Sequence, residues 1–342
     1  MSYGMNMVQD RTEPVLLTVG IPTYNGSAGI LDTLDSVIWQ IPEELVSRVD
    51  ILISDNASTD ETEKIVRDYL ETRSPRIQYS RNDKNVGFDR NVDMLFKKAS
   101  GKYVWILADD DVLADGALLH ILNLLDQHPD LKAVQVNYDK YDLKLERIVH
   151  QVIIPEDLYC RDAETFLVNS KGRYGAVSTL IIDRDAWNSE DLSDGMGTAV
   201  LHMFGLLKIL LKGDSYIAHQ PLVKVREGST KSVTNGDSLL RVALSSGTLF
   251  HCMKKMGYGS QIIRWHLRMD KRYAYNAILL AKLRGIKNRS AAVKKLIAVH
   301  NSLELWLIWI PFILLPDFLV PKGAIRNVIV LLKRVRAYLG AA

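Results

Sequence analysis

The sequence predicts an α/β protein with a mostly parallel sheet covered by helices on both faces, followed by a helical, basic C-terminal region. Over the first 140 residues, short apolar runs alternate with amphipathic stretches, which is the pattern of repeated βαβ units. Beyond residue 238 the chain shows long basic amphipathic stretches and no strand signal of comparable strength. These two patterns divide the chain into a sheet-forming part and a helical part.

The expected elements follow from the periodicity of the apolar residues. Strands are predicted at 15–21, 49–54, 77–80, 103–107 and 133–138. Helices are predicted at 29–40, 61–70, 89–98 and 116–127. The pattern from 140 to 219 is less regular, with a strand at 177–183, a glycine-rich loop at 194–197 and a helix at 198–211.

The composition is that of a globular protein, since 47% of the 342 residues are hydrophobic and 24% are charged. We expect an N-terminal tail at 1–14, a sheet-forming domain at 15–237 and a helical region at 238–342. The sheet-forming domain divides into halves of about 15–112 and 113–237. Two cysteines are too few for a disulfide framework, and residues 1–14 lack the apolar run of a signal peptide. Both observations favour the cytoplasm.

The net charge of +3 conceals an uneven distribution. From residue 251 onward there are 17 Lys or Arg and three acids, so this part carries +14 and the preceding part −11. Residues 305–315 are uninterruptedly apolar but shorter than the roughly 20 residues that span a bilayer. The segment is either a buried helix or an interfacial element at the inner leaflet of the plasma membrane. Its apolar character favours lipid over nucleic acid.

Three consecutive carboxylates, Asp109, Asp110 and Asp111, follow a predicted buried strand. Ligands of parallel α/β sheets bind beyond the carboxyl ends of the strands, so this triplet lies at the ligand-binding edge. Adjacent carboxylates repel one another, and a hard divalent cation with oxygen ligands relieves that repulsion. We therefore expect a Mn²⁺ or Mg²⁺ site that stabilises a diphosphate.

Other polar clusters follow the neighbouring strands and could bind a nucleotide. Their members are Pro22, Thr23, Tyr24 and Asn25 after the first strand, Asp55 and Asn56 after the second, and Arg81, Asn85, Gly87 and Arg90 after the third. Asp55 and Asn56 can hydrogen-bond a pyrimidine edge, although a turn or a helix cap also explains such residues. Arg90 could contact phosphate, hold the aspartate loop or form a structural ion pair.

Four strings in order and spacing resemble glycosyltransferase family 2. They are Val-Gly-Ile-Pro-Thr-Tyr-Asn at 19–25, Ile-Ser-Asp-Asn-Ala-Ser-Thr-Asp at 53–60, Asn-Val-Gly-Phe-Asp-Arg-Asn at 85–91 and Gly-Lys-Tyr-Val-Trp-Ile-Leu-Ala-Asp-Asp-Asp at 101–111. The resemblance covers about residues 15–235. The third and fourth strings look most like the abequosyltransferase branch of O-antigen enzymes.

This resemblance implies a GT-A fold, which is Rossmann-like, and a nucleotide-diphosphate-sugar donor. A CDP-sugar such as CDP-abequose is favoured, with UDP- or dTDP-sugars as alternatives, and the acceptor would be a polyprenyl-diphosphate-linked oligosaccharide. Thr23, Tyr24, Asp55 and Arg81 would surround the base, Asp109 the ribose and Asp111 the metal, with Asp110 in either of the last two roles.

A later stretch, 223–232, resembles the mobile segment that closes over the diphosphate in this family. Its expected contacts are Arg226 and Ser232. His219, just upstream, could add an imidazole ligand to the metal or be an ordinary surface histidine.

The sequence departs from the family at the catalytic base. Inverting members commonly place a Glu-Asp pair at the start of the helix that faces the acceptor, and here that helix begins Gly-Thr-Ala-Val-Leu-His at 197–202. His202 could take the acceptor proton, or Asp191 or Asp194 could do so, and inversion is the implied outcome. Arg173, Tyr174, Ser178 and Thr179 lie at or just before the preceding strand, where it would face the acceptor. They are candidates for binding the acceptor sugar, although core packing or solvent exposure would also explain them.

Two alternatives remain open. A sugar nucleotidyltransferase also joins a parallel sheet to metal-binding carboxylates, but it needs a Gly-rich, Arg/Lys-containing loop that 22–26 does not provide. A non-catalytic, membrane-associated scaffold that binds sugar nucleotides would explain the missing Glu-Asp pair.

Overall fold

The computed structural model describes residues 14–73, 77–228, 239–240, 245, 249, 252–299, 305–316, 319, 321 and 323. These residues form two compact units. The first contains the described residues up to 166 together with 173–191 and 208–228. The second contains 167–172, 192–207 and the described residues from 239 onward. The predicted boundary at 237/238 lies outside the described residues.

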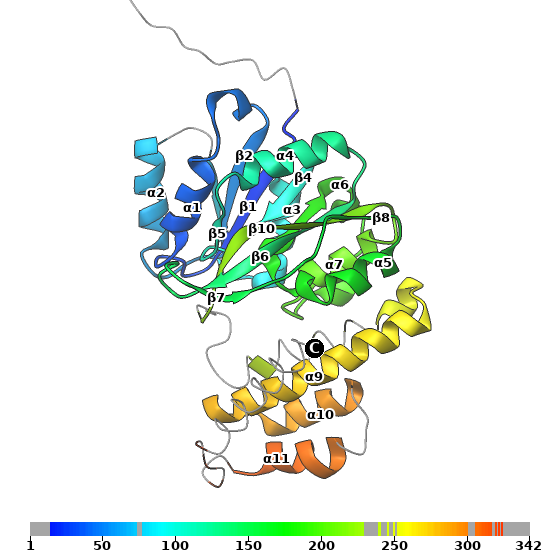
Figure 1. The fold of residues 1–342 in the computed structure, drawn as a ribbon. Helices are drawn as coiled ribbons and strands as arrows, with labels where there is room; N and C mark the ends of the chain where they lie inside the picture. The colour runs from blue at the N-terminus through cyan, green and yellow to red at the C-terminus, as the bar shows by residue number, and fades with distance from the viewer. Residues whose placement is uncertain are drawn as a thin grey trace, which may run out of the picture. The chain divides into compact units, whose positions relative to one another are not determined.

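The first unit is built on one mixed sheet, shown in Figure 1. Its strands are β1 Leu17–Thr23, β2 Val49–Asp55, β3 Ile77–Arg81, β4 Tyr103–Ile106, β5 Val112–Leu113, β6 Ala133–Tyr141, β7 Ile148–Gln151, β8 Leu158–Cys160, β9 Leu180–Asp183 and β10 Ser215–Arg226. The order is β3-β2-β1-β4-β9-β6-β10-β5, with β7 on β6 and β8 on β10. The strands β1 to β4, β6 and β10 run in one direction, which confirms a mostly parallel sheet.

The helices follow the predicted alternation in the first half of the chain. They are α1 Ile30–Ile38, α2 Thr62–Arg73, α3 Phe88–Lys98, α4 Ala117–Gln127, α5 Ala163–Ser170, α6 Arg184–Asn188, α7 Leu201–Ile209, α9 Ser260–Arg284, α10 Arg289–Val299 and α11 Ile310–Leu314. Up to the strand predicted at 133–138, each predicted element is present with ends within about three residues of the expected ones.

The predicted strand at 177–183 is wrong in its first half. Residues Val177–Thr179 form a 3-10 turn, and only Leu180–Asp183 form β9, antiparallel to β4 and β6. The Thr179 hydroxyl donates to the Ala176 carbonyl at 2.7 Å, and such local bonds compete with a strand ladder. The strand β10 was not predicted.

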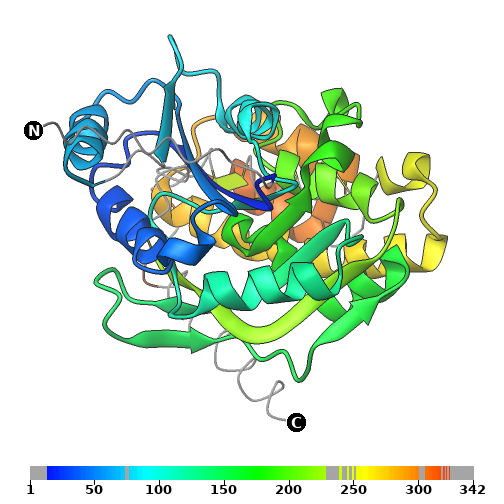
Figure 2. The same cartoon turned by 90° about the horizontal axis from the view of Figure 1, so that it is seen from above.

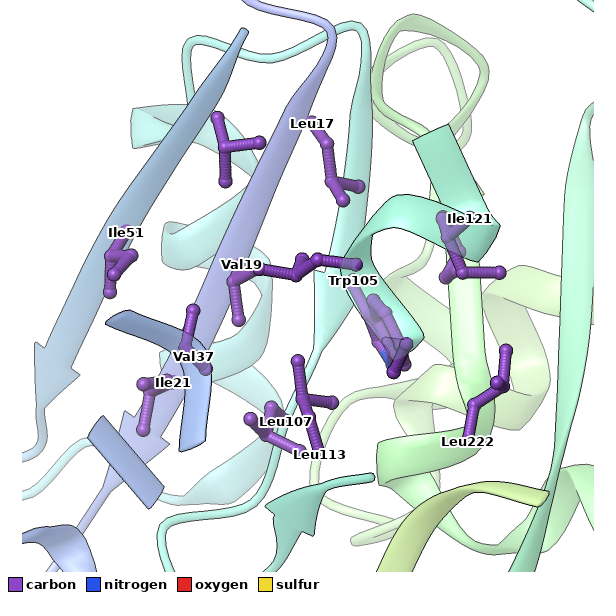
Figure 3. Close-up of a cluster of buried hydrophobic side chains, with 14 of the residues drawn as sticks. Leu17, Val19, Ile21, Val37, Ile51, Trp105, Leu107, Leu113, Ile121 and Leu222 are labelled. Carbon is purple, nitrogen blue, oxygen red and sulfur yellow. The ribbon is translucent and has the colours of Figure 1, made fainter. Parts of the chain in front are cut away.

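Alternation along β1 divides the side chains between the two faces of the sheet. Leu17, Val19 and Ile21 join the core that contains residues of α1 and α4, and Figure 3 shows them in one apolar cluster with Val37 and Trp105. On the other face, a Cβ at Gly20 would lie 2.3 Å from Leu95 of α3, so α3 packs closely there. Figure 2 shows α3 on the side of the sheet opposite α1 and α4. Helices therefore cover both faces, as predicted.

The second unit has its own core, formed by α9, α10, α11 and the π-helical turn Leu305–Trp309. Tyr275 of α9 stacks on Trp309 with ring centroids 4.4 Å apart. Within the part of the chain that the structure describes, no helix is both long and apolar enough to cross a membrane.

We predict that the second unit loses stability in mild acid through His266. This α9 side chain is 2% exposed, and burial lowers its pKa to about 4. The unfolded chain takes up a proton below pH 6.5 while the folded chain does not, so stability falls between pH 6.5 and 4. The loss is about 3 kcal/mol at most.

Urea unfolding followed by tryptophan fluorescence at a series of pH values measures this effect. His266→Asn removes the titrating group and should flatten the pH dependence in that window. An unchanged slope in this variant would assign the pH dependence to another group.

Candidate functional site

Polar side chains gather where the parallel strands end. β1 ends at Thr23, β2 at Asp55 and β3 at Arg81, and the register pairs Thr23 with Asp55 and Asp55 with Arg81. The Asn56 N–H extends this register by donating to the Thr23 carbonyl at 2.9 Å. The Thr23 hydroxyl donates to Asp109 Oδ2 at 2.5 Å and so joins the aspartate loop to the end of β1. The predicted clusters after these strands therefore share one edge of the sheet.

Asp111 is the most constrained carboxylate of the aspartate loop. It is 6% exposed, and its Oδ2 accepts a hydrogen bond from the Ser178 hydroxyl at 2.5 Å. Its Oδ1 accepts the Arg226 backbone N–H at 3.0 Å. Ser178 also accepts the Ala108 N–H at 3.0 Å, so one hydroxyl supports both the loop and its last carboxylate. Two segments far from the aspartate loop in sequence thus fix this side chain.

Charge accumulates at this loop. Burial, and after it the neighbouring Asp110 carboxylate, raise the pKa of Asp111 to about 7, although the bonds from Ser178 and Arg226 oppose the rise. The described residues contain no cluster of three or more His, Cys, Asp or Glu side chains able to cage a metal ion. Mg²⁺ sites in nucleotide-using enzymes commonly need only one or two carboxylates, because substrate phosphates complete the coordination. The donor set fits a Mg²⁺- or Mn²⁺-diphosphate better than a bare ion.

Asp55 is fully buried at the end of β2. Its Oδ1 accepts the N–H and the hydroxyl of Ser58 at 2.8 and 2.6 Å, and its Oδ2 accepts the Tyr79 hydroxyl at 2.6 Å. Burial and this bond to Asp55 raise the pKa of Tyr79. Arg81 Nη2 donates to the Ser58 carbonyl at 2.9 Å, and Arg81 Nε lies 3.8 Å from Asp55 Oδ2. A carboxylate has about four acceptor positions, and the protein itself fills three of them at Asp55.

Asparagine side chains hold the neighbouring loop in place. Asn56 donates to Asn85 Oδ1 at 3.0 Å and accepts the Val86 N–H at 2.9 Å. Asn91 of α3 accepts the Ser54 hydroxyl at 2.8 Å and donates to the Ser54 carbonyl at 2.8 Å. Asn56 and Asn85 therefore have a structural role in this network.

The other predicted nucleotide residues occupy the same edge with different exposure. Pro22 lies within β1, whereas Tyr24 just past its end is 41% exposed. Asn25 adopts φ 54°, and its Oδ1 accepts the Thr59 N–H at 2.8 Å. Gly87 has φ 86° immediately before α3, a conformation that favours glycine. Arg90 is exposed in the first turns of α3.

Arg226 closes the aspartate loop from the end of β10. Its Nε donates to the Asp110 carbonyl at 2.8 Å, its Nη1 to the Leu143 carbonyl at 2.7 Å, and its Nη2 pairs with Asp32 at 2.6 Å. Only 10% of the side chain is exposed. In this arrangement the guanidinium binds protein acceptors, in contrast to the expected diphosphate contact. Ser232, its predicted partner in that contact, lies outside the described residues.

His219 is not brought to the aspartates. Its Nδ1 lies 3.0 Å from Asp157 Oδ1, and its N–H donates to the same oxygen. His219 and Arg226 belong to one strand, on which seven residues span about 20 Å. Because Arg226 contacts Asp111, this distance separates His219 from the proposed metal position.

The predicted acceptor residues are mostly buried. Tyr174, Ser178 and Thr179 are each at most 1% exposed, and the Ser178 and Thr179 hydroxyls bond within the protein. Arg173 donates to the Ile153 carbonyl at 3.1 Å, and burial lowers its pKa. The structure thus assigns Ser178 to the aspartate loop and leaves Arg173 as the most accessible of the four.

The three candidate bases lie in different parts of the structure. Asp191 is exposed in the first unit, and Asp194 is exposed in a 3-10 turn, Ser193–Gly195, of the second unit. His202 is 4% exposed in the first turn of α7, also in the second unit.

Sequence reasoning missed several residues that shape the site. Ser58 and Tyr79 bind Asp55, Asn82 bonds Asn91 at 3.0 Å, and Asp32 binds Arg226. Ser58 lies within the polar cluster that was singled out after β2, so its role could have been suspected. The positions of Tyr79 and Asp32 carry no such signal.

The fold and the acidic edge define a GT-A domain. Among solved structures, the chain resembles Staphylococcus aureus TarS residues 1–349 in complex with UDP-GlcNAc, with a TM-score of 0.60 and 18% identity over 83% of this chain and 82% of that one. It also resembles the mannosyltransferase PcManGT of Pyrobaculum calidifontis in complex with GDP-Man and Mn²⁺. That match has a TM-score of 0.51 and 17% identity over 95% of this chain and 90% of the other.

Sequence similarity identifies the family. Residues 18–186 match glycosyl transferase family 2, and the chain belongs to this family. It is 31% identical to the abequosyltransferase RfbV of Salmonella typhimurium over 205 residues, 57% of this chain and 61% of the relative. It is 33% identical over 103 residues to the GalNAc(5)-diNAcBac-PP-undecaprenol β-1,3-glucosyltransferase of Campylobacter jejuni, 30% of this chain and 32% of the relative. The matches thus span about three fifths and one third of these relatives.

We predict that Arg226→Ala destabilises the first unit by about 2 kcal/mol, because the Asp110 and Leu143 carbonyls and the Asp32 carboxylate lose a charged donor whose side chain is only 10% exposed. Arg226→Lys should recover only part of the loss, since an ammonium group cannot reproduce the planar fork. Urea unfolding measures both variants.

Arg147→Ala is the matched control. Its side chain is 85% exposed and pairs with Asp142, so we expect a loss below about 0.5 kcal/mol. Equal losses in Arg226→Ala and Arg147→Ala would contradict a structural role for the Arg226 guanidinium.

Proposed function

We propose that this chain is a metal-dependent glycosyltransferase that moves a sugar from a nucleotide-diphosphate donor to the hydroxyl of a glycan acceptor. The aspartate loop at the carboxyl edge of the sheet, with Asp111 raised in pKa beside Asp110, is the observation that carries the proposal. Membership of glycosyl transferase family 2 supports the reaction class.

The donor nucleotide binds across the ends of β1, β2 and β3 in this proposal. Asp55 holds the end of β2 beneath the base through its bonds to Ser58 and Tyr79, while the exposed ring of Tyr24 offers a surface for packing. Arg81 lies 3.8 Å from Asp55 Oδ2 and supports the same edge of the sheet. Asp109 binds the ribose, and its bond from Thr23 fixes its orientation.

Asp111 would hold the Mn²⁺ or Mg²⁺ ion, with Asp110 as a second carboxylate or a ribose contact. The Ser178 hydroxyl and the Arg226 N–H orient the Asp111 carboxylate before any ligand arrives. When bound, the divalent cation supplies positive charge against the diphosphate that leaves with the nucleotide.

Activation of the acceptor hydroxyl is assigned to His202, with Asp191 and Asp194 as the alternatives. An imidazole has an ordinary pKa near neutrality and can accept the proton as the sugar carbon becomes cationic. A single displacement of this kind inverts the configuration at the anomeric carbon.

The donor is proposed to be a CDP-sugar such as CDP-abequose, by analogy with the RfbV relative, with UDP- or dTDP-sugars as the runner-up. The acceptor is proposed to be a polyprenyl-diphosphate-linked oligosaccharide of O-antigen or surface polysaccharide synthesis, since the Campylobacter relative is named for an undecaprenol-linked substrate. Such an acceptor places the enzyme in the cytoplasm, peripherally at the inner face of the plasma membrane.

Thermal unfolding with CDP-, UDP-, GDP- and dTDP-sugars, each with and without Mn²⁺, tests donor and metal together. We expect one donor to stabilise the protein by about 2.7 kcal/mol at a hundred times its Kd, and more with Mn²⁺ than without. Asp111→Asn should abolish the Mn²⁺-dependent part. Failure of all four donors to shift the unfolding temperature with Mn²⁺ present would refute donor binding.

Steady-state transfer assays test the base. His202→Ala should lower kcat about 10²- to 10⁴-fold at an unchanged KM for the donor, because only proton removal is affected. Asp191→Asn and Asp194→Asn, tested in parallel, should retain turnover. Full turnover in all three variants would move the base elsewhere, and donor binding without any turnover in the wild type would favour a non-catalytic scaffold.

A further inference from the structure

The segment Leu305–Leu315 of the second unit has two faces. Leu305, Ile310 and Ile313 are buried in the core formed with α9 and α10. The outer apolar face consists of the exposed large side chains of residues 305–315, with exposed fractions in parentheses: Trp306 (48%), Leu307 (67%), Ile308 (56%), Leu314 (51%) and Leu315 (39%). Exposure of five large apolar side chains within eleven residues is typical of an interaction site.

The inner face holds this segment firmly. Trp309 stacks on Tyr275, and the ammonium group of Lys282 in α9 donates a hydrogen bond to the Leu315 carbonyl. The same ammonium group lies 5.6 Å from the centroid of the Phe312 ring. Because these contacts anchor the segment to α9, the outer apolar face cannot simply turn inward.

The charge pattern of the sequence favours an anionic partner. Residues 305–316 contain no charged residue, and the 25 residues after Asp317 contain five cations and no acid. Anionic lipid headgroups attract cations that flank an apolar surface, and tryptophan prefers the boundary between headgroups and acyl chains.

A second copy of the chain is a poorer partner for this face. Residues from 251 onward carry a charge of +14, so two copies meeting here would bring two basic regions together. A lipid surface offers apolar contact and opposite charge at once.

We propose that the outer apolar face docks on an anionic lipid bilayer and lies in its interface without crossing it. The contact does not depend on glycosyl transfer, and it goes beyond the proposed reaction by naming the surface that meets the membrane. Side chains of this face would enter the boundary between headgroups and acyl chains, while α9 and α10 stay outside it.

Cosedimentation of the full-length protein with vesicles tests the proposal. The probe is phosphatidylcholine vesicles with and without phosphatidylglycerol. We expect binding that is stronger with phosphatidylglycerol and weaker at high salt. Leu307→Glu/Ile308→Glu should reduce partitioning at least about tenfold, because two apolar side chains leave the interface.

Ile153→Glu is the matched control, since Ile153 is 77% exposed in the first unit and outside the face. It should bind vesicles like the wild type. Equal binding by Leu307→Glu/Ile308→Glu and wild type would overturn the proposal. The proposal would also be overturned if the wild type formed a dimer that does not bind vesicles and the double variant were monomeric. The face would then join two copies of the chain.

Quenching of tryptophan fluorescence by brominated lipids needs no change to the apolar side chains that anchor the segment. Vesicles of brominated phosphatidylcholine and phosphatidylglycerol should quench the wild type, and Trp306→Phe should lose much of that quenching while still binding. Undiminished quenching in Trp306→Phe would place another part of the chain at the lipid and reject this face. Loss of membrane binding with intact transfer to a water-soluble acceptor would leave the catalytic proposal standing.

Discussion

The buried carboxylate of Asp111 is the constraint on which the rest of the site depends. It has to be held beside Asp110 despite their mutual repulsion, and the protein does so with one hydroxyl and one backbone N–H. The hydroxyl requires the 3-10 turn that contains Ser178, and the N–H requires the end of β10 to reach the loop. Both features interrupt the simple alternation of strands and helices that builds this edge of the sheet.

That interruption explains the structure between β4 and β10. If residues 177–179 continued as a strand, the Ser178 side chain would follow the alternation of β9 and could not bond both Asp111 and Ala108. β10 pairs with β6 through Arg226 and with β5 at Val223 and Lys224, so its last residues are carried past the aspartate loop. The Arg226 guanidinium then bonds Asp32 of α1, the Asp110 carbonyl and the Leu143 carbonyl in the turn after β6. The mixed sheet is thus a means of bringing late residues back to an early motif.

The sequence predicted those parts whose signal is local. Strand ends carrying Thr23, Asp55 and Asp109 could be recognised because apolar runs stop there and polar clusters begin. Ser178 and Asp32 could not, because their roles depend on partners 67 and 194 residues away. Ser178 was assigned to the acceptor from its position on a predicted strand, and the 3-10 turn redirects its side chain to Asp111. His219 was a plausible metal ligand by residue type alone, and the strand that carries it places Asp157 beside it instead.

The segment 305–315 shows a different limit of sequence reasoning. Its uninterrupted apolar composition is compatible with burial and with an interface, because periodicity cannot be read from a run that has no polar residue. The structure separates the two possibilities residue by residue: Leu305, Ile310 and Ile313 enter the core, while Leu307 and Ile308 remain exposed. If the exposed side chains dock on lipid as proposed, the run has no position at which a polar side chain is favoured. Its lack of amphipathic pattern would then follow from contacts on two sides.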